Sequence, residues 1–406
     1  MKKLDSQRIA KEFVEKSGFY QEPAHIKQLK DVNSFKKQLL NLTAPSSEEL
    51  VYNAQLNKWF KKYNYTEIRR LGSGAFGSTS LVHDNNIDRN FVLKTITLTK
   101  DNIKSIFQEI DMLKKIAKYG CKTNLLCYVD YYINYSDKTL YIVTDTFDNS
   151  KTLFDFIRYH QKHKIKIPTG DLLKIMKGLL QALVYLHKIG IAHADIKPEN
   201  ILINDNLDIQ LIDFGISCAK DCSVKGTVLY QSPELLMITS KKVNNKELKK
   251  GDIFSMGVVF YLLANLSLPY PTKSTLYPLA TMNTYDNSDN THPVVSFDNP
   301  MSAMFSLVEY YRKIRGYLTK KEREVLKTEG KTLPPNFIMS TYEYENDTID
   351  KKINVLIETM LDTNENTRPL AKHCMSLLNK ILAIYNLKNN MQVISPGIIS
   401  PSGQSN

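Results

Sequence analysis

The sequence of 406 residues has few cysteines and no long apolar stretch. Its five cysteines include no Cys-x-x-Cys pair, which favours free thiols in a reducing, intracellular compartment. The longest apolar run, from Ile253 to Ala264, contains Ser255 and Gly257 and is shorter than the roughly 20 residues that span a membrane. The N-terminus lacks the unbroken apolar stretch of a signal peptide. The sequence therefore predicts a soluble, intracellular protein without a membrane segment.

The composition excludes wholesale disorder, because 42% of the residues are hydrophobic and 10% are aromatic. The formal net charge of +12 favours polyanionic partners such as nucleotides, although lysines scattered over the surface explain the same excess. We find no specific nucleic-acid site. Heavy use of Lys, Asn, Ile and Tyr is typical of AT-rich genomes, such as those of some protists or large DNA viruses.

The pattern along the chain predicts two lobes of an α+β fold with extensions. Residues 1–63 form an N-terminal extension. Residues 64–147 contain short β-branched and aromatic stretches, typical of an antiparallel sheet, and one helical segment. Residues 148–386 are mainly helical, with a polar, mobile insert at 281–300. The Ser-, Pro-, Gly- and Asn-rich tail, 387–406, is predicted to be disordered.

A glycine-rich motif, Gly72-Ser-Gly74-Ala-Phe-Gly77, lies between two predicted strands. Glycines allow backbone N–H groups to approach phosphates closely. A dinucleotide site would continue from strand into helix, whereas here a strand follows, so we disfavour a dinucleotide fold. Lys94 ends the next apolar strand, and the following helix presents Glu109 on its inner face, where it can pair with that lysine.

The most specific motif is His193-Ala-Asp195-Ile-Lys197-Pro-Glu-Asn200. An aspartate positioned as a base, a lysine two residues later and an asparagine to hold a metal are suited to phosphoryl transfer. Asp213-Phe-Gly215 supplies a second oxygen ligand, of the kind that Mg²⁺ prefers.

These motifs, in this order, resemble the eukaryotic-type protein kinases over about residues 65–386. The resemblance implies a bilobal fold, with a small antiparallel-sheet lobe and a larger helical lobe, and binding of ATP and Mg²⁺. It places Lys94, Glu109 and the glycine-rich loop on the phosphates, Asn200 and Asp213 on the metal, and Asp195 and Lys197 at the reacting hydroxyl. It also assigns an adenine pocket, with Thr144 at its back, main-chain groups of Asp145 and Phe147 at its edge, and the side chains Leu71, Thr79, Val92 and Leu202.

Two further roles follow from the resemblance. Asp252 is expected to brace the backbone of the catalytic loop, and Arg368 to pair with Glu234 inside the large lobe. Lys197, together with Thr227, resembles the serine/threonine branch rather than the tyrosine branch.

The sequence departs from the family at position 194, where Ala194 replaces the arginine that pairs with an activation-loop phosphate. The segment from Asp213 to Glu234 is also short, with Ser223 and Thr227 as its candidate hydroxyl sites. Constitutive activity, or control by another part of the chain, is therefore expected. Thr79 and Val92 depart from the usual adenine-facing residues, which predicts ordinary to weak nucleotide affinity. Cys218 and Cys222 lie four residues apart in this segment, and we expect free thiols rather than a metal or redox switch.

The predicted function is ATP-dependent phosphorylation of Ser and Thr hydroxyls of protein substrates. A pseudokinase that scaffolds partners is the first alternative, although Lys94, Asp195, Asn200 and Asp213 are all retained. A small-molecule kinase is disfavoured because the segment GTVLYQSPE suits a peptide substrate.

Overall fold

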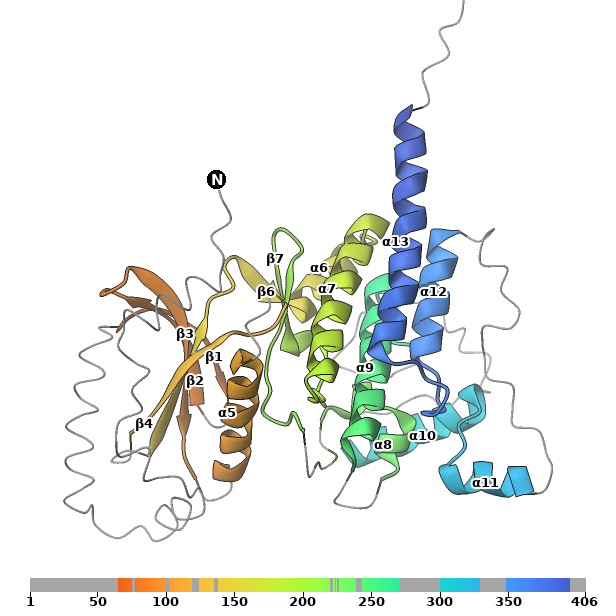
Figure 1. The fold of residues 1–406 in the computed structure, drawn as a ribbon, viewed down its shortest axis with the longest axis horizontal. Coiled ribbons are helices and arrows are strands. Elements are labelled where there is room, and N and C mark those ends of the chain that lie inside the picture. The colour runs from red at the N-terminus through yellow and green to blue at the C-terminus, as the bar shows by residue number, and fades with distance from the viewer. Residues whose placement is uncertain are drawn as a thin grey trace, which may run out of the picture. The chain divides into compact units, whose positions relative to one another are not determined.

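The structure is a computed structural model (Figure 1), and it describes part of the chain. The described residues are 65–74, 77–99, 102–118, 124–134, 138–219, 222, 224, 226–238, 243–270, 300–328 and 348–394. The predicted N-terminal extension, Ser223 and the insert at 281–300, apart from Pro300, lie outside them. Contacts divide the chain into two units: residues up to Asn149 with Ile212–Ser217, and Ser150–Leu211 with the residues from Cys218 onward.

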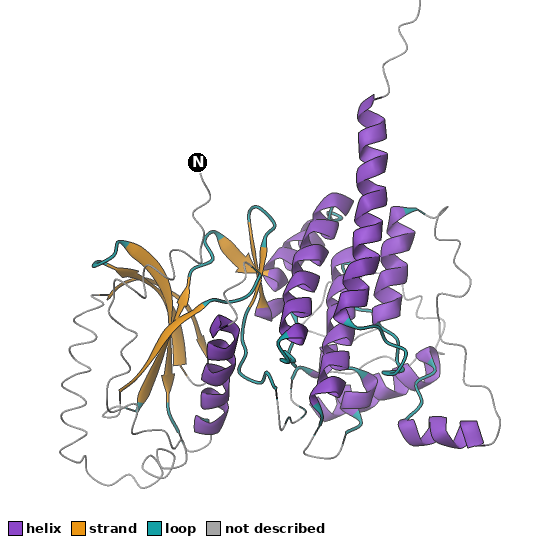
Figure 2. Ribbon diagram, viewed as in Figure 1, coloured by secondary structure: helices purple, strands orange, loops and turns teal. Residues whose placement is uncertain are grey.

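The first unit is built on an antiparallel sheet in the order β1-β2-β3-β5-β4. Its strands and its helix follow the expected segments (Figure 2). The bounds are β1 (Tyr65–Gly74), β2 (Gly77–Asp84), β3 (Arg89–Thr97), α5 (Ile103–Lys118), β4 (Tyr128–Asn134) and β5 (Thr139–Asp145). Helix α5 forms because apolar side chains recur at helical spacing, and four of them are buried: Ile106, Ile110, Leu113 and Ile116.

The second unit is mainly helical, with a small sheet in the order β6-β7-β8. Its first part contains β6 (Ser150–Thr152), α6 (Leu153–His163), α7 (Thr169–Lys188), the 3-10 turn Pro198–Asn200, β7 (Ile201–Asn204) and β8 (Ile209–Leu211). After a second 3-10 turn, Val228–Tyr230, come α8 (Pro233–Leu236), α9 (Asn245–Asn265), α10 (Pro300–Arg315), α11 (Lys320–Thr328), α12 (Ile349–Met360) and α13 (Ala371–Ile394). The α+β fold class expected from the sequence is confirmed.

Helices α7 and α9 form the centre of the second unit. Helix α7 packs against α13, α9 and β8, and α12 packs against α9 and α13. Helix α9 begins with a capping box, in which the Asn244 side chain accepts from the Glu247 N–H and the Glu247 carboxylate accepts from the Asn244 N–H. This start lies upstream of the apolar run from Ile253 to Ala264. Asp252 therefore lies inside the helix rather than before it.

Two expectations about the chain are wrong. The tail does not become irregular at residue 387, because α13 continues to Ile394, and the first proline after it is Pro396. The cysteines are not all free, because Cys218 and Cys222 form a disulfide and Cys127 is also disulfide-bonded. Cys374, which is buried in α13, is free as expected.

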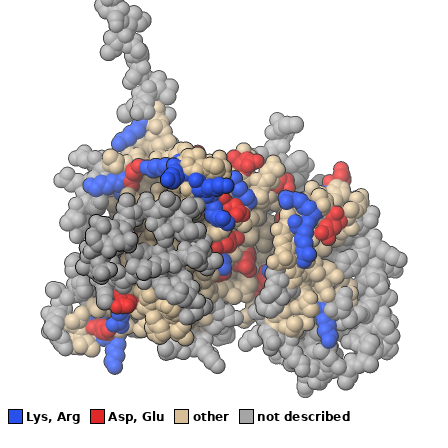
Figure 3. Space-filling view, turned by 180° about the vertical axis from the view of Figure 1, so that it is seen from behind, with Lys and Arg blue, Asp and Glu red and all other residues tan. Residues whose placement is uncertain are grey.

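On the face drawn in Figure 3, several basic side chains of the described residues lie in a row at the upper left, with acidic side chains beside them. Among the described residues, none of the helices is long and apolar enough to cross a membrane.

Candidate active site

The glycine-rich loop connects β1 to β2. Gly74 pairs with Gly77 and Gly72 pairs with Thr79 across the two strands, while Leu71 is 43% exposed. A Cβ on Gly77 would lie 1.8 Å from the Thr95 carbonyl oxygen, so this position requires glycine for the close approach of β3. A Cβ on Gly72 would meet no atom within 4 Å, so there is open space beside this residue.

Four predicted site residues share one face of the sheet. Thr79 pairs with Lys94, and Val92 pairs with Thr144. Directly opposite residues in antiparallel strands point to the same face, and so do residues two apart in one strand. The register therefore brings Thr79, Val92, Lys94 and Thr144 together, as an adenine-and-phosphate surface requires.

Lys94 is held by carboxylates within the first unit. Its Nζ donates to Glu109 Oε1 of α5 at 2.7 Å. Burial on its own lowers the pKa of Lys94, but the Glu109 and Asp213 carboxylates outweigh it and raise that pKa above the ordinary value. A Cβ on Gly215 would lie 3.2 Å from Asp213 Oδ1 and 3.6 Å from Glu109 Oε2, so these two carboxylates approach the same point. Lys94 is therefore a stable cation beside Asp213.

An ion pair that the sequence did not predict joins the start of β3 to the end of β5. Arg89 donates to both carboxylate oxygens of Asp145, at 2.8 and 2.7 Å. The Asp145 N–H also donates to the Cys127 carbonyl at 2.9 Å. The Asp145 side chain is thus engaged by β3, which is consistent with a ligand contact through its main chain only. Phe147 lies two residues beyond β5, and Leu202 is half-buried in β7 of the second unit.

The catalytic loop gathers three polar side chains around Asp195. Lys197 Nζ lies 2.9 Å from Asp195 Oδ2. Asn200 Nδ2 donates to the Asp195 carbonyl at 2.9 Å and to Oδ2 at 3.0 Å. Thr227 donates its N–H and its hydroxyl to Asp195 Oδ1, both at 3.0 Å, and its hydroxyl also accepts from Lys197 Nζ at 2.8 Å. Thr227 is therefore a direct hydrogen-bond partner of both Asp195 and Lys197.

These bonds set the ionisation of Asp195. Burial on its own raises the pKa of Asp195, but hydrogen bonds and charge from Lys197, with the two bonds from Thr227, lower it below the ordinary value. Asp195 is therefore ionised well into the acidic range and accepts hydrogen bonds rather than donating them.

Asp252 braces the catalytic loop, as expected. Its carboxylate accepts the N–H groups of His193 at 2.9 Å and Ala194 at 2.8 Å, and it also contacts His187 Nε2 at 2.9 Å. Asp252 is only 2% exposed and belongs to α9, so a buried residue of a long helix fixes the backbone of the catalytic loop.

The expected ion pair between Arg368 and Glu234 is also confirmed. Arg368 donates through Nη1 and Nη2 to the two carboxylate oxygens, at 2.7 and 3.0 Å. The Arg368 side chain is completely buried, whereas that of Glu234 is 12% exposed. The pair anchors the residues that follow Thr227.

The expected metal ligands are suited to Mg²⁺. Asn200 uses its amide nitrogen for Asp195, which orients its Oδ1 as the oxygen for a cation. Asp213 has a φ of +63° and accepts the Gly215 N–H at Oδ1, at 3.2 Å. Amide and carboxylate oxygens are the hard ligands that Mg²⁺ takes together with substrate phosphates.

Comparison with known proteins agrees with this geometry. The family model described as "Protein kinase domain" matches residues 65–377, which is more than half of the chain. This protein therefore belongs to the protein kinase family.

Curated relatives carry kinase names. Serine/threonine-protein kinase cds1 of Schizosaccharomyces pombe is 32% identical over 227 residues, covering 52% of this chain and 46% of the relative. Calcium-dependent protein kinase 4 of Plasmodium falciparum is 27% identical over 219 residues, covering 51% and 38%. Serine/threonine-protein kinase ppk11 of S. pombe is 28% identical over 230 residues, covering 55% and 67%. The chain thus spans less than half the length of the first two of these relatives.

Proposed function

We propose that this protein is an active serine/threonine kinase, which transfers the γ-phosphoryl group of Mg-ATP to Ser and Thr hydroxyls of proteins. The observation that carries the proposal is the ionised Asp195 carboxylate, fixed by Lys197, Asn200 and Thr227. A chain that has lost catalysis has no need to keep this set of bonds together with the Lys94–Glu109 pair.

The first unit binds and orients the nucleotide. The glycine-rich backbone and Lys94 contact phosphates, with Glu109 holding the lysine in place. Thr144, Val92, Thr79 and Leu71 line the adenine side, with Leu202 and main-chain groups of Asp145 and Phe147. Asn200 and Asp213 hold Mg²⁺, which when bound neutralises charge on the phosphates.

Asp195 orients the acceptor hydroxyl and takes its proton. A carboxylate with a lowered pKa is a weak base, so its main contribution is to accept a hydrogen bond from the hydroxyl and orient it. Lys197 supplies positive charge at the same carboxylate and offsets the charge of the transferred group. The catalytic effect is therefore mainly positioning and electrostatics.

Serine/threonine specificity is supported by Lys197 and its bond to Thr227 and by the names of the relatives. Protein substrates fit the segment GTVLYQSPE, whose Thr227 lies directly on Asp195. The intracellular location remains a prediction from the sequence.

The test is transfer of radiolabelled γ-phosphate to generic acceptor proteins, followed by phosphoamino-acid analysis. Wild type should label serine and threonine, whereas Asp195→Asn and Lys94→Met should each lose at least about a thousandfold in rate, or roughly 4 kcal/mol. Asp205→Asn, an exposed turn aspartate, is the matched control and should retain full activity. Wild type without transfer but with normal ATP binding would favour the pseudokinase alternative.

A further inference from the structure

Among the described residues of the segment from Cys218 to Thr227, three contact the catalytic loop or the residue just before it. Cys218 and Ala192 exchange both backbone hydrogen bonds, each at 2.9 Å. Gly226, with a φ of +112°, lies so close to Ala194 that a Cβ would be 2.6 Å from its carbonyl oxygen. Thr227 donates two bonds to Asp195. The position of this segment therefore determines the surroundings of the Asp195 carboxylate.

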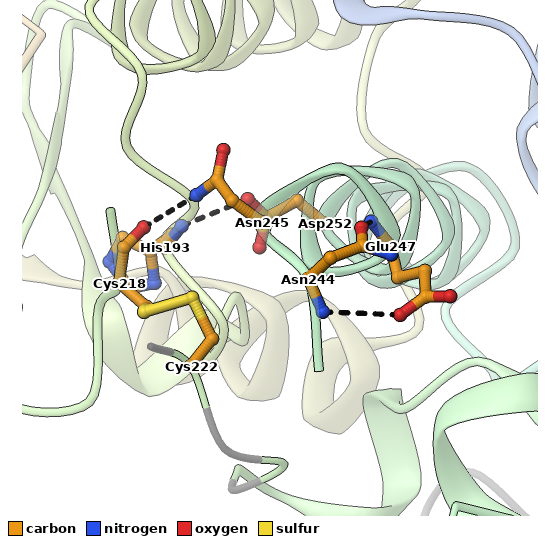
Figure 4. Close-up of a disulfide and its surroundings, with 7 residues drawn as sticks. All are labelled: His193, Cys218, Cys222, Asn244, Asn245, Glu247 and Asp252. Carbon is orange, nitrogen blue, oxygen red and sulfur yellow. Dashed lines mark hydrogen bonds between the residues drawn. A yellow bond between two sulfur atoms is a disulfide. The ribbon is translucent and has the colours of Figure 1, made fainter. Parts of the chain in front are cut away.

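The disulfide between Cys218 and Cys222 lies within the same segment (Figure 4), with a Cα–Cα distance of 5.6 Å. The Cys218 carbonyl accepts from Asn245 Nδ2 at 2.8 Å, and the Cys222 carbonyl accepts from the Val243 N–H at 3.1 Å. Asn245 is the first residue of α9, the helix whose Asp252 braces the loop. The disulfide thus connects the catalytic loop on one side with the entry to α9 on the other.

Ala194 belongs to the same cluster as the two cysteines. Cys222, Ala192 and Leu235 are buried in an apolar cluster, and Ala194 and Cys218 pack against it. At this position the resemblance leads one to expect an arginine that pairs with a phosphate. The methyl group of Ala194, packed against this cluster, cannot bind a phosphate, so position 194 supplies no phosphate anchor of that kind.

We propose that Cys218 and Cys222 are positioning residues for the phosphotransfer reaction and form a redox-modifiable site. Their disulfide holds the segment from Cys218 to Thr227 against Asp195. In family members with an arginine at the position of Ala194, a phosphate bound by that arginine has this effect. The inference rests on the proposed function. An external dithiol reduces this disulfide. One thiolate of the reagent attacks the sulfur of Cys218, the more exposed of the two cysteines, and releases the Cys222 thiolate. The second thiolate of the reagent then displaces Cys218, which leaves two protein thiols and one reagent disulfide.

The experiment compares the full chain in oxidised and reduced dithiothreitol. Reduction should lower kcat about tenfold with little change in the KM for ATP, because the segment contacts Asp195, which acts on the acceptor hydroxyl. The Cys218→Ser/Cys222→Ser variant should show the low kcat and no response to the reagent. If this variant still responds, the effect comes from the disulfide of Cys127, and the proposal is wrong.

Amide hydrogen exchange tests the positioning without relying on activity. Reduction should accelerate exchange at Cys218 and Thr227 by about tenfold or more, while the amides of α7 remain unchanged. Unchanged exchange at both positions would overturn the proposal even if activity fell. Conversely, an oxidised protein that transfers no phosphate refutes the proposed function, but the exchange result still decides whether the disulfide holds the segment. If the double variant does not fold, titrating wild type through a series of dithiothreitol redox buffers replaces it, with the same expected changes.

Discussion

Removal of the Arg368 side chain should destabilise the second unit strongly. Besides its two bonds to Glu234, Arg368 donates Nε to the Asp362 carbonyl and Nη1 to the Lys250 carbonyl, both at 2.8 Å. The guanidinium also lies 5.0 Å from the centre of the Phe254 ring. Each of the three guanidinium nitrogens therefore donates at least one hydrogen bond inside the protein.

The magnitude follows from what Arg368→Ala leaves behind. Stranding one partner of a buried ion pair costs roughly 3–5 kcal/mol, and each buried carbonyl left without a donor adds about 1–3 kcal/mol before relaxation. Because Glu234 is 12% exposed, water will partly solvate it, so we expect a loss of about 5 kcal/mol rather than the full sum. Arg368→Lys keeps the charge but loses the two-pronged geometry, and it should cost about half as much.

Urea denaturation followed by circular dichroism measures these losses. The control is Lys166→Ala, which removes an ion pair with Asp350 whose side chains are 67% and 54% exposed. Exposed pairs contribute about 0–1 kcal/mol, so this variant should unfold close to wild type. If Arg368→Ala unfolded within about 1 kcal/mol of wild type, the argument from buried charge would be refuted.

Three further predictions concern the turn at Gly226, a titrating strand residue and phosphorylation. Gly226→Ala should lose roughly 1–3 kcal/mol in urea melts because of its positive φ and the Ala194 carbonyl, whereas Gly72→Ala, with open space around it, should match wild type. Burial raises the pKa of Asp130 from 3.8 to about 6, so stability should fall as pH rises through that interval. Asp130→Asn should then be up to roughly 3 kcal/mol more stable than wild type at pH 8 and equal to it near pH 3; equal stability at both pH values would contradict this. Protein treated with phosphatase should keep most of its turnover, and a loss above about 90% would show that a phosphate anchor exists despite Ala194.

Local pattern was sufficient for the elements that hold the predicted site. The strand β2 has the bounds of the segment GSTSLVHD, and α5 follows the spacing of its isoleucines. The motif residues reach their positions because the same apolar side chains determine the register of the strands and which side of the helix faces the sheet. Glu109 can meet Lys94 because it lies on the buried side of α5, among the apolar side chains that recur at helical spacing.

Contacts between distant segments were not predictable in this way. The Arg89–Asp145 pair forms because the neighbour of β3 in the sheet is β5 and not β4, and nothing local in these strands specifies that order. The disulfide was missed for a similar reason. A spacing of four residues does not show whether two cysteines approach each other, whereas bridges to Ala192 and Val243, far away in the sequence, bring Cys218 and Cys222 together.

Backbone strain identifies the functional loops independently of the motifs. Non-glycine residues rarely adopt a positive φ, and most of those that do here lie in turns or end helices: Asp88, Lys138, Asn149, Lys164, Leu207 and Leu266. Ala194 and Asp213, at +69° and +63°, lie in the predicted catalytic and metal-binding loops. Such strain costs about 1–3 kcal/mol and persists only where surrounding bonds impose it. For Ala194 the restraint comes from the Asp252 carboxylate, which accepts its N–H, and from packing against the apolar cluster that contains Cys222. The same contacts that replace a phosphate anchor therefore also keep the catalytic loop in its strained conformation, which is why we expect loosening of the segment to change kcat before it unfolds the protein.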